Sequence, residues 1–175
     1  MTYAVVFASQ TGNTRRVAEA IRDALPADSC LSFGPPSPAA AGAELLFVGS
    51  WADKGDCAPE VAAFLEGLSD QRVALFGTAG FGGSDAYFDQ LAARFAAHLP
   101  GGCRLTGRFF CQGKMPPSVR RRYEQMQAEN PGDPKVEGML ANFDAALAHP
   151  SAADLAAAAA FAREQAEVKH CPLLF

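Results

Sequence analysis

The sequence predicts a doubly wound α/β fold built on a parallel sheet, and two features lead to that prediction. Residues 3–8, 44–49 and 72–78 are short runs dominated by apolar residues. Such runs are typical of parallel strands that are buried on both faces. Stretches with apolar residues at helical spacing separate the runs, and this alternation favours helices on both faces of one sheet.

The first half of the chain also contains a helix and a weaker strand. Apolar residues recur at helical spacing from Val17 to Ala24, so we expect a helix that ends near Leu25, where Pro26 stops it. A short, weak strand is expected over residues 30–33, before three closely spaced prolines interrupt the chain.

The middle of the chain continues the alternation. Pro59 favours the start of a helix, and Val61 and Leu65 belong to its apolar side. Ser84 is a suitable N-cap for a further helix, whose inward side includes Phe88.

The C-terminal part is richer in helix. A last strand is expected over residues 104–111, and two helical segments, 119–126 and 136–147, follow it with prolines between them. A final helix is expected over residues 151–169. A length of 175 residues suits one core, and no long linker divides the chain, so we expect a single domain over residues 1–175.

Composition and charge exclude several classes of protein. Apolar residues make up 49% of the chain and charged residues 19%, as in folded globular proteins. No apolar stretch reaches the roughly 20 residues that a membrane-spanning helix needs, and the first residues lack the basic start of a secretory signal. The formal net charge of -4 disfavours a nucleic-acid-binding protein, which normally carries a basic excess.

The cysteines and histidines give no metal-binding pattern. The five cysteines form no C-x-x-C pair, and their number is odd. We therefore expect reduced thiols in a cytoplasmic protein, with neither a disulfide framework nor a zinc site. His98, His149 and His170 form no metal-spaced cluster with the cysteines, so no metal site is predicted.

The loop after the first strand predicts an anion-binding site. In a parallel sheet the ligand lies beyond the carboxyl ends of the strands. The hydroxyls of Ser9, Thr11 and Thr14 can donate to phosphate oxygens, Gly12 permits a tight turn, and a helix N-terminus follows. The loop lacks the lysine of a Walker A motif. The alternative is a plain β–α turn capped by Asn13 or Thr14, and we favour the anion site.

The loop after the second strong strand carries Trp51, the only tryptophan of the chain. Its ring offers a flat surface for stacking on a planar ligand, and the alternative is a hydrophobic plug over the end of the sheet. Asp53, Lys54 and Gly55 follow. Gly55 can permit a peptide flip, although a simple turn glycine is the commoner case.

The loop after the third strong strand, residues 77–83, is rich in glycine without being a dinucleotide-binding motif, because Asp85 stands where the last glycine is required. Its glycines allow backbone amides to approach a ligand. Phe81 is a second candidate for stacking, or else an anchor packed on the core. Tyr87 is a further candidate, although it lies inside a helical pattern.

Residues beyond the last strand add fewer signals. The loop at 111–114 brings polar groups to the same edge of the sheet. Cys111 lacks a neighbouring histidine to activate it, so a buried thiol is the better interpretation than a nucleophile. Arg120, Arg121 and Arg122 form either a solvated helix face or a docking patch for an acidic partner.

These loops together predict a ligand with a phosphate at one end and a flat heteroaromatic system at the other. FMN is such a ligand. No catalytic dyad, metal cluster or Ser/His/Asp arrangement accompanies the loops, so no catalytic residue is predicted.

At this point the sequence resembles the flavodoxins. The family begins with a strand followed by [Ser/Thr]-x-Thr-Gly-x-Thr, which is matched at residues 9–14, and its second flavin loop often carries a tryptophan, as in Gly49-Ser50-Trp51. The third loop usually supplies a tyrosine, and Phe81 is the nearest equivalent. Residues 51–55, 76–83, 111–115 and 120–123 look like a bacterial subgroup that includes proteins associated with gut bilirubin reductases.

The resemblance implies a five-stranded parallel sheet of order 2-1-3-4-5 with an extended C-terminal helical part, bound FMN, and electron transfer to or from a partner redox protein. The alternative is an FMN-dependent NAD(P)H:quinone-type oxidoreductase, whose substrate slot the long C-terminal part could cover. A cation at Lys54 would raise the potential of the reduced flavin, whereas an apolar sandwich would lower it. The cofactor-binding residues implied are Ser9, Gln10, Thr11, Gly12, Asn13, Thr14, Ser50, Trp51, Asp53, Lys54, Gly55, Thr78, Ala79, Gly80, Phe81 and Gly82.

Overall fold

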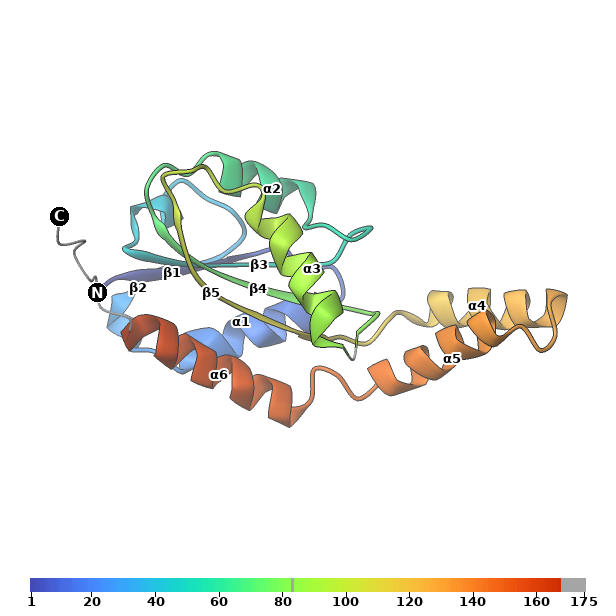
Figure 1. The fold of residues 1–175 in the computed structure, drawn as a ribbon. Helices are drawn as coiled ribbons and strands as arrows, with labels where there is room; N and C mark the ends of the chain where they lie inside the picture. Colours follow the sequence, from blue (N-terminus) through green and yellow to red (C-terminus); the bar gives the residue numbers. More distant parts are fainter. Residues whose placement is uncertain (83, 168–175) are drawn as a thin grey trace.

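A computed structural model describes residues 1–82 and 84–167 and contains the expected parallel sheet (Figure 1). The strands are β1 (Tyr3–Phe7), β2 (Cys30–Gly34), β3 (Leu45–Trp51), β4 (Arg72–Ala79) and β5 (Arg104–Gln112). All pair in parallel, in the order β2-β1-β3-β4-β5. The predicted fold class and strand order are confirmed.

Helices follow the strands as the alternation predicts. They are α1 (Asn13–Asp23), α2 (Pro59–Glu66), α3 (Asp85–Ala96), α4 (Pro117–Glu129), α5 (Pro134–Ala146) and α6 (Ala152–Glu167). Ser84 is the N-cap of α3, because its Oγ accepts a hydrogen bond of 3.3 Å from the Tyr87 backbone N–H. The end of the expected last helix, with His170 and Cys171 beyond it, lies outside the described residues. None of the described helices is long and apolar enough to cross a membrane.

Helices cover both faces of the sheet (Figure 1). On one face, Ile21 of α1 and Phe161 of α6 pack against a core that includes Phe47 of β3. On the other face, Leu65 of α2 and Phe95 of α3 pack against apolar residues of the same strands. Both faces are therefore closed, and the carboxyl edge of the sheet is left to the loops.

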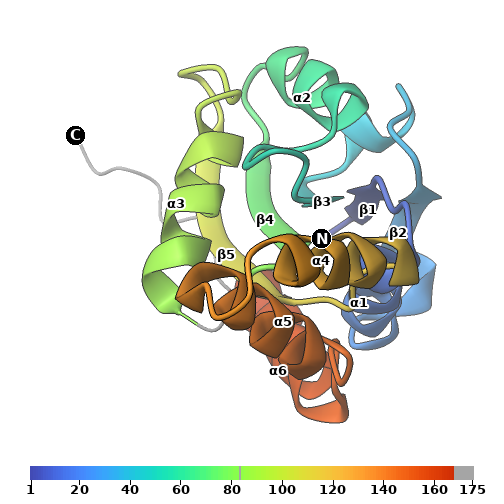
Figure 2. The same ribbon diagram turned by 90° about the vertical axis from the view of Figure 1, so that its right-hand side faces the viewer.

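Helices α4 and α5 form a hairpin, residues 117–146, which we call the arm. The arm projects away from the sheet at its carboxyl edge, and Figure 2 views it end on. Tyr123 is the one buried residue of α4, while Val136, Phe143 and Ala146 are buried in α5. The expected extended helical part thus divides in two: α6 returns to the sheet, and the arm does not.

Candidate cofactor site

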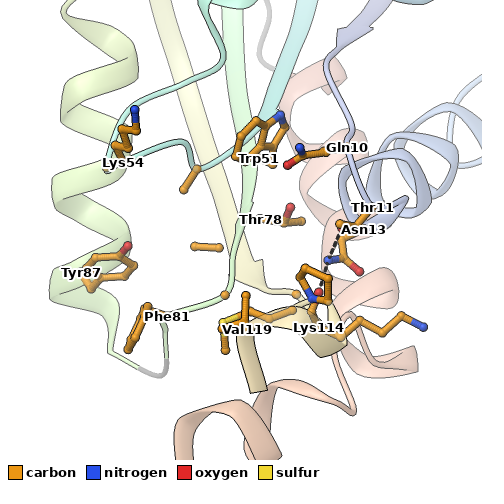
Figure 3. A pocket seen from close by; sticks show the side chains of 17 residues that line it. Gln10, Thr11, Asn13, Trp51, Lys54, Thr78, Phe81, Tyr87, Lys114 and Val119 are labelled. Atoms are coloured by element: carbon orange, nitrogen blue, oxygen red, sulfur yellow. Dashed lines mark hydrogen bonds between the residues drawn. The ribbon is translucent and has the colours of Figure 1, made fainter. Parts of the chain in front are cut away.

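A cavity of about 380 Å³ lies at the carboxyl edge of the sheet (Figure 3). Its size is in the range of small-molecule sites. It collects residues from all three loops that the sequence singled out, and from the start of α4. The lining residues are Gln10, Thr11, Asn13, Trp51, Ala52, Lys54, Gly55, Thr78, Ala79, Gly80, Phe81, Tyr87, Gly113, Lys114, Met115, Pro116 and Val119.

The first loop presents the N-terminus of α1 to this edge. Gly12 has a φ of 88°, a left-handed conformation that glycine adopts without strain, and no side chain caps the helix at this position. Arg15 and Arg16 stand in the first turn, where positive charge is unfavourable for an isolated helix. An anion bound at the helix N-terminus would offset that charge, so the loop fits a phosphate.

The side chains of the first loop divide into three groups. Gln10, Thr11 and Asn13 line the cavity. Ser9 and Gly12 line a neighbouring cavity, and the Ser9 Oγ accepts a hydrogen bond of 3.2 Å from the Arg15 backbone N–H. Thr14 is only 1% exposed.

Thr14 and Asn13 differ in whether their polar atoms already have hydrogen-bond partners inside the protein. The Thr14 hydroxyl is hydrogen-bonded to the Thr78 hydroxyl at 2.9 Å, inside the protein. The Asn13 Nδ2 donates to Thr11 Oγ1 (3.1 Å) and to the Lys114 carbonyl (2.9 Å). Its Oδ1 is a buried hydrogen-bond acceptor left without a partner among the described residues, 1–82 and 84–167.

The second loop is a tight turn beneath Trp51. Lys54 (φ 51°) and Gly55 (φ 87°) are both left-handed. The backbones of Asp53 and Asp56 exchange hydrogen bonds of 2.8 and 3.0 Å across them. Trp51 and Lys54 line the cavity, whereas Asp53 is not among its lining residues.

Ser50 stabilises the base of this loop. It is fully buried, and its Oγ donates to the Trp51 carbonyl (2.8 Å) and accepts from the Ala58 backbone N–H (2.9 Å). These contacts shape the loop that carries Trp51. The structure thus gives Ser50 a supporting position behind the cavity, whose lining does not include it.

The third loop is held by the arm. The Gly80 carbonyl accepts hydrogen bonds of 3.1 Å from Gln112 Nε2 of β5 and 3.1 Å from Asn142 Nδ2 of α5. Gln112 Nε2 also donates to Asn142 Oδ1 at 3.0 Å. Phe81 is 44% exposed and lines the cavity, and Gly82 lies behind it against Phe88.

The aromatic side chains stand around the cavity. In Figure 3 the Trp51 ring and the rings of Phe81 and Tyr87 lie on different sides of the space between the loops. A flat ligand can therefore contact an aromatic ring on more than one side. Tyr87, which the sequence places inside a helical pattern, reaches the cavity from the first turn of α3.

Several residues that line or support the cavity are missing from the predicted cofactor-binding residues. Gly113, Lys114, Met115, Pro116 and Val119 line the cavity, whereas the sequence placed residues 111–114 at this edge of the sheet without assigning them to the cofactor. Asn142 carried no signal, because it contacts Gly80 from 62 residues away along the chain. The Arg120 side chain, expected on a helix face, is paired with Glu124 (2.9 Å) and Asp144 and lies 5.5 Å from the Phe143 ring centroid. Arg121 and Arg122 are exposed.

The charges at the cavity are positive. Among the described residues, its lining contains Lys54 and Lys114 and no histidine, cysteine or carboxylate. Burial, with the nearby Asp154 carboxylate, raises the pKa of the Cys111 thiol to about 12, so this thiol is neutral at physiological pH. A cavity with this lining suits an anionic, aromatic ligand.

The profile of the flavodoxin domain matches residues 4–163. The chain belongs to the flavodoxin domain family. FMN is the cofactor that this membership implies, and the residues present fit it: a helix N-terminus for the phosphate, an unpartnered Asn13 oxygen, and rings beside the cavity.

Relatives and solved structures agree with this assignment. The chain is 38% identical over 174 residues to the flavodoxin-like domain-containing protein BilS of Clostridium symbiosum (strain WAL-14163), covering 90% of this chain and 92% of the relative. It is 26% identical over 166 residues to BilS of Clostridioides difficile (strain CD3), covering 91% and 93%. These flavodoxin-like relatives confirm the resemblance that the loop motifs indicate.

Two solved flavodoxins share the fold. A flavodoxin from the domain Archaea aligns with a TM-score of 0.53 at 16% identity, covering 95% of this chain and 97% of its own. Oxidised flavodoxin 2 from Bacillus cereus aligns with a TM-score of 0.51 at 18% identity, covering 95% and 99%.

Proposed function

We propose that this protein binds FMN in the cavity at the carboxyl edge and carries electrons to or from a partner redox enzyme. The observation that carries the proposal is the cavity itself. It joins the N-terminus of α1, Trp51 and Tyr87 around one space, and its described lining residues include two lysines and no carboxylate. In this arrangement Thr11 and the backbone of the first loop hold the phosphate, and the aromatic side chains hold the ring system.

The chain's own residues support a carrier more than an enzyme. Bound FMN supplies the redox chemistry, while the lining residues position it and favour negative charge through Lys54 and Lys114. Among the described residues, the lining contains no histidine, cysteine or carboxylate. The arm projects away from the sheet, and Val119 at its base lines the cavity, so the arm is exposed to a partner and is not folded over a substrate slot.

The partner is proposed to be a reductase that receives electrons from the flavin. The similarity to BilS proteins, with the subgroup motifs at Trp51 and Phe81, favours a bilirubin reductase as the class of partner. The free thiols of Cys30, Cys57, Cys103 and Cys111 support a reducing, cytoplasmic location.

The proposal is tested with the purified, FMN-loaded protein. Stepwise chemical reduction should resolve into one-electron steps, and NAD(P)H with quinones should give no rapid turnover. Addition of a candidate reductase and its substrate should then reoxidise the flavin. Rapid NAD(P)H–quinone turnover by the isolated chain would instead support the oxidoreductase alternative.

A further inference from the structure

Behind the second loop, three side chains from different segments point their donor atoms at one another. Asp56 and Cys57 follow the tight turn at Lys54 and Gly55, and His98 follows the end of α3. The carboxylate oxygen, the thiol sulfur and the imidazole nitrogen all lie within 4.8 Å of one another. Asp56, Cys57 and His98 are not among the residues that line the cofactor cavity, although Lys54 and Gly55 just before them are.

The spacing resembles that of a tetrahedral metal site. His98 Nε2 lies 3.2 Å from Asp56 Oδ2. Zinc binds nitrogen and oxygen ligands at about 2.0–2.2 Å, so two such ligands of one tetrahedral ion lie about 3.3 Å apart. An ion between these groups therefore requires little movement of either side chain.

The opposite side of the imidazole also has the partner that metal-binding histidines use. His98 Nδ1 lies 2.8 Å from Glu66 Oε1 at the end of α2. A carboxylate on the second ring nitrogen fixes the orientation of a histidine and raises its basicity as a ligand. Glu66 thus directs Nε2 toward Asp56.

A cation at this cluster would compete with protons for Cys57 and His98. Burial, and then the charge of Asp56, raises the pKa of the Cys57 thiol to about 12. The hydrogen bond to Glu66 raises the pKa of His98. A divalent ion neutralises the same carboxylates and converts the thiol to a coordinating thiolate. Binding therefore releases the Cys57 proton and, where His98 is protonated, its proton as well.

We propose that Asp56, Cys57 and His98 form a binding site for Zn²⁺ or a similar transition-metal ion, with Glu66 orienting His98 and solvent completing the coordination. This proposal departs from the sequence-based prediction of no metal site, because the fold brings His98 to within 4.8 Å of the ligand atoms of Asp56 and Cys57. An ion here ties the loop that carries Trp51 to the ends of α2 and α3. The site is a structural clamp on the flavin loop and takes no part in electron transfer.

The test measures metal on the full-length, FMN-loaded protein. After equilibration with Zn²⁺ and gel filtration, the wild type should retain one equivalent of zinc and gain thermal stability, since an ion that binds only the folded state stabilises it. Cys57→Ser and His98→Gln should each lose both effects. Cys103→Ser and His149→Gln are matched controls, because they remove a thiol and a carboxylate-paired histidine outside the cluster.

Cobalt provides a readout that identifies the ligands. Co²⁺ should give the visible bands of a tetrahedral centre and a thiolate-to-metal charge-transfer band that Cys57→Ser abolishes. Circular dichroism verifies that the variants fold. Zinc retained equally by wild type, Cys57→Ser and His98→Gln, or no zinc retained by folded wild-type protein, would overturn the proposal and leave the cluster as an ion pair between His98 and its carboxylates.

Discussion

The sheet and the arm are built in opposite ways. The strands β1, β3 and β4 are buried over nearly their whole length, and helices cover both of their faces. In the arm, α4 buries only Tyr123, and Arg120 joins the two helices through charged and cation–π contacts. The sheet therefore supplies stability, while the arm adds surface beside the cofactor cavity and one polar contact to the third loop.

The largest expected effect is on the free energy of unfolding, which a core substitution in the sheet should lower far more than one in the arm. Phe47 in β3 is fully buried. Its ring centroid lies 6.3 Å from that of Tyr3 and 6.2 Å from that of Phe161. Phe47→Ala should lower the free energy of unfolding by about 3–5 kcal/mol. Phe143→Ala, a matched change in the arm, should loosen the arm and leave the main unfolding transition in place. Equal losses in denaturant titrations would show that the arm belongs to the main cooperative unit.

A second comparison separates phosphate binding from ring stacking within the cavity. Thr11→Ala removes a hydroxyl available to the phosphate and should weaken FMN binding by about 10- to 100-fold, the cost of a hydrogen bond to a charged group. Trp51→Phe keeps an aromatic face and should cost less, about threefold. Thr14→Ala should chiefly lower stability, because its hydroxyl bonds Thr78 inside the protein. FMN titration measures the loss of affinity in each of the three variants, and thermal unfolding measures the loss of stability. A larger loss of FMN affinity in Trp51→Phe than in Thr11→Ala would contradict the prediction.

The contact between the arm and the third loop gives a smaller effect. Asn142→Ala removes one of the two side-chain donors to the Gly80 carbonyl and leaves Gln112 in place. FMN binding should weaken roughly fivefold, which corresponds to about 1 kcal/mol. Gln125→Ala, on the exposed surface of α4, is the control and should bind FMN normally. If both variants bind like the wild type, the arm does not influence the cofactor loop.

The smallest expected effect is on how the stability of the protein depends on pH, through His98 and its contact with Asp56 of the second loop. The hydrogen bond to Glu66, and that to Asp56, raise the pKa of His98 above its ordinary value of 6.5. Because the folded pKa exceeds the unfolded one, the stabilisation from His98 is complete below about pH 6.5 and is lost as pH rises through the folded pKa. With a chelator present, His98→Gln should flatten this part of the stability–pH profile. High salt should reduce the effect, since these carboxylates are exposed.

The sequence predicted the sheet well because its signals are local. The apolar runs around Val5, Phe47 and Leu75 can be recognised as buried strands without knowing their neighbours, and Ser84 and Pro59 mark helix starts by their own chemistry. The first loop was similarly predictable, since Thr11 lies just before α1 and Asn13 begins it, and both line the cavity.

What the sequence could not give are contacts between distant segments. Asn142 is 62 residues from Gly80, and His98 is 42 residues from Asp56, so neither pair leaves a spacing pattern. Side-chain direction was equally hidden. Ser50 and Thr14 have the right chemistry for a ligand, but the strand and helix turn both hydroxyls into the protein.

The central claim is that FMN binds beside Trp51 at the carboxyl edge of the sheet. Trp51 is the only tryptophan of the chain, so its fluorescence reports on this site alone. Titration of the flavin-free protein with FMN should quench that fluorescence in a saturable, one-to-one manner, and riboflavin, which lacks the phosphate, should quench it far more weakly. FMN binding that leaves Trp51 fluorescence unchanged, or no binding at all, would contradict the account.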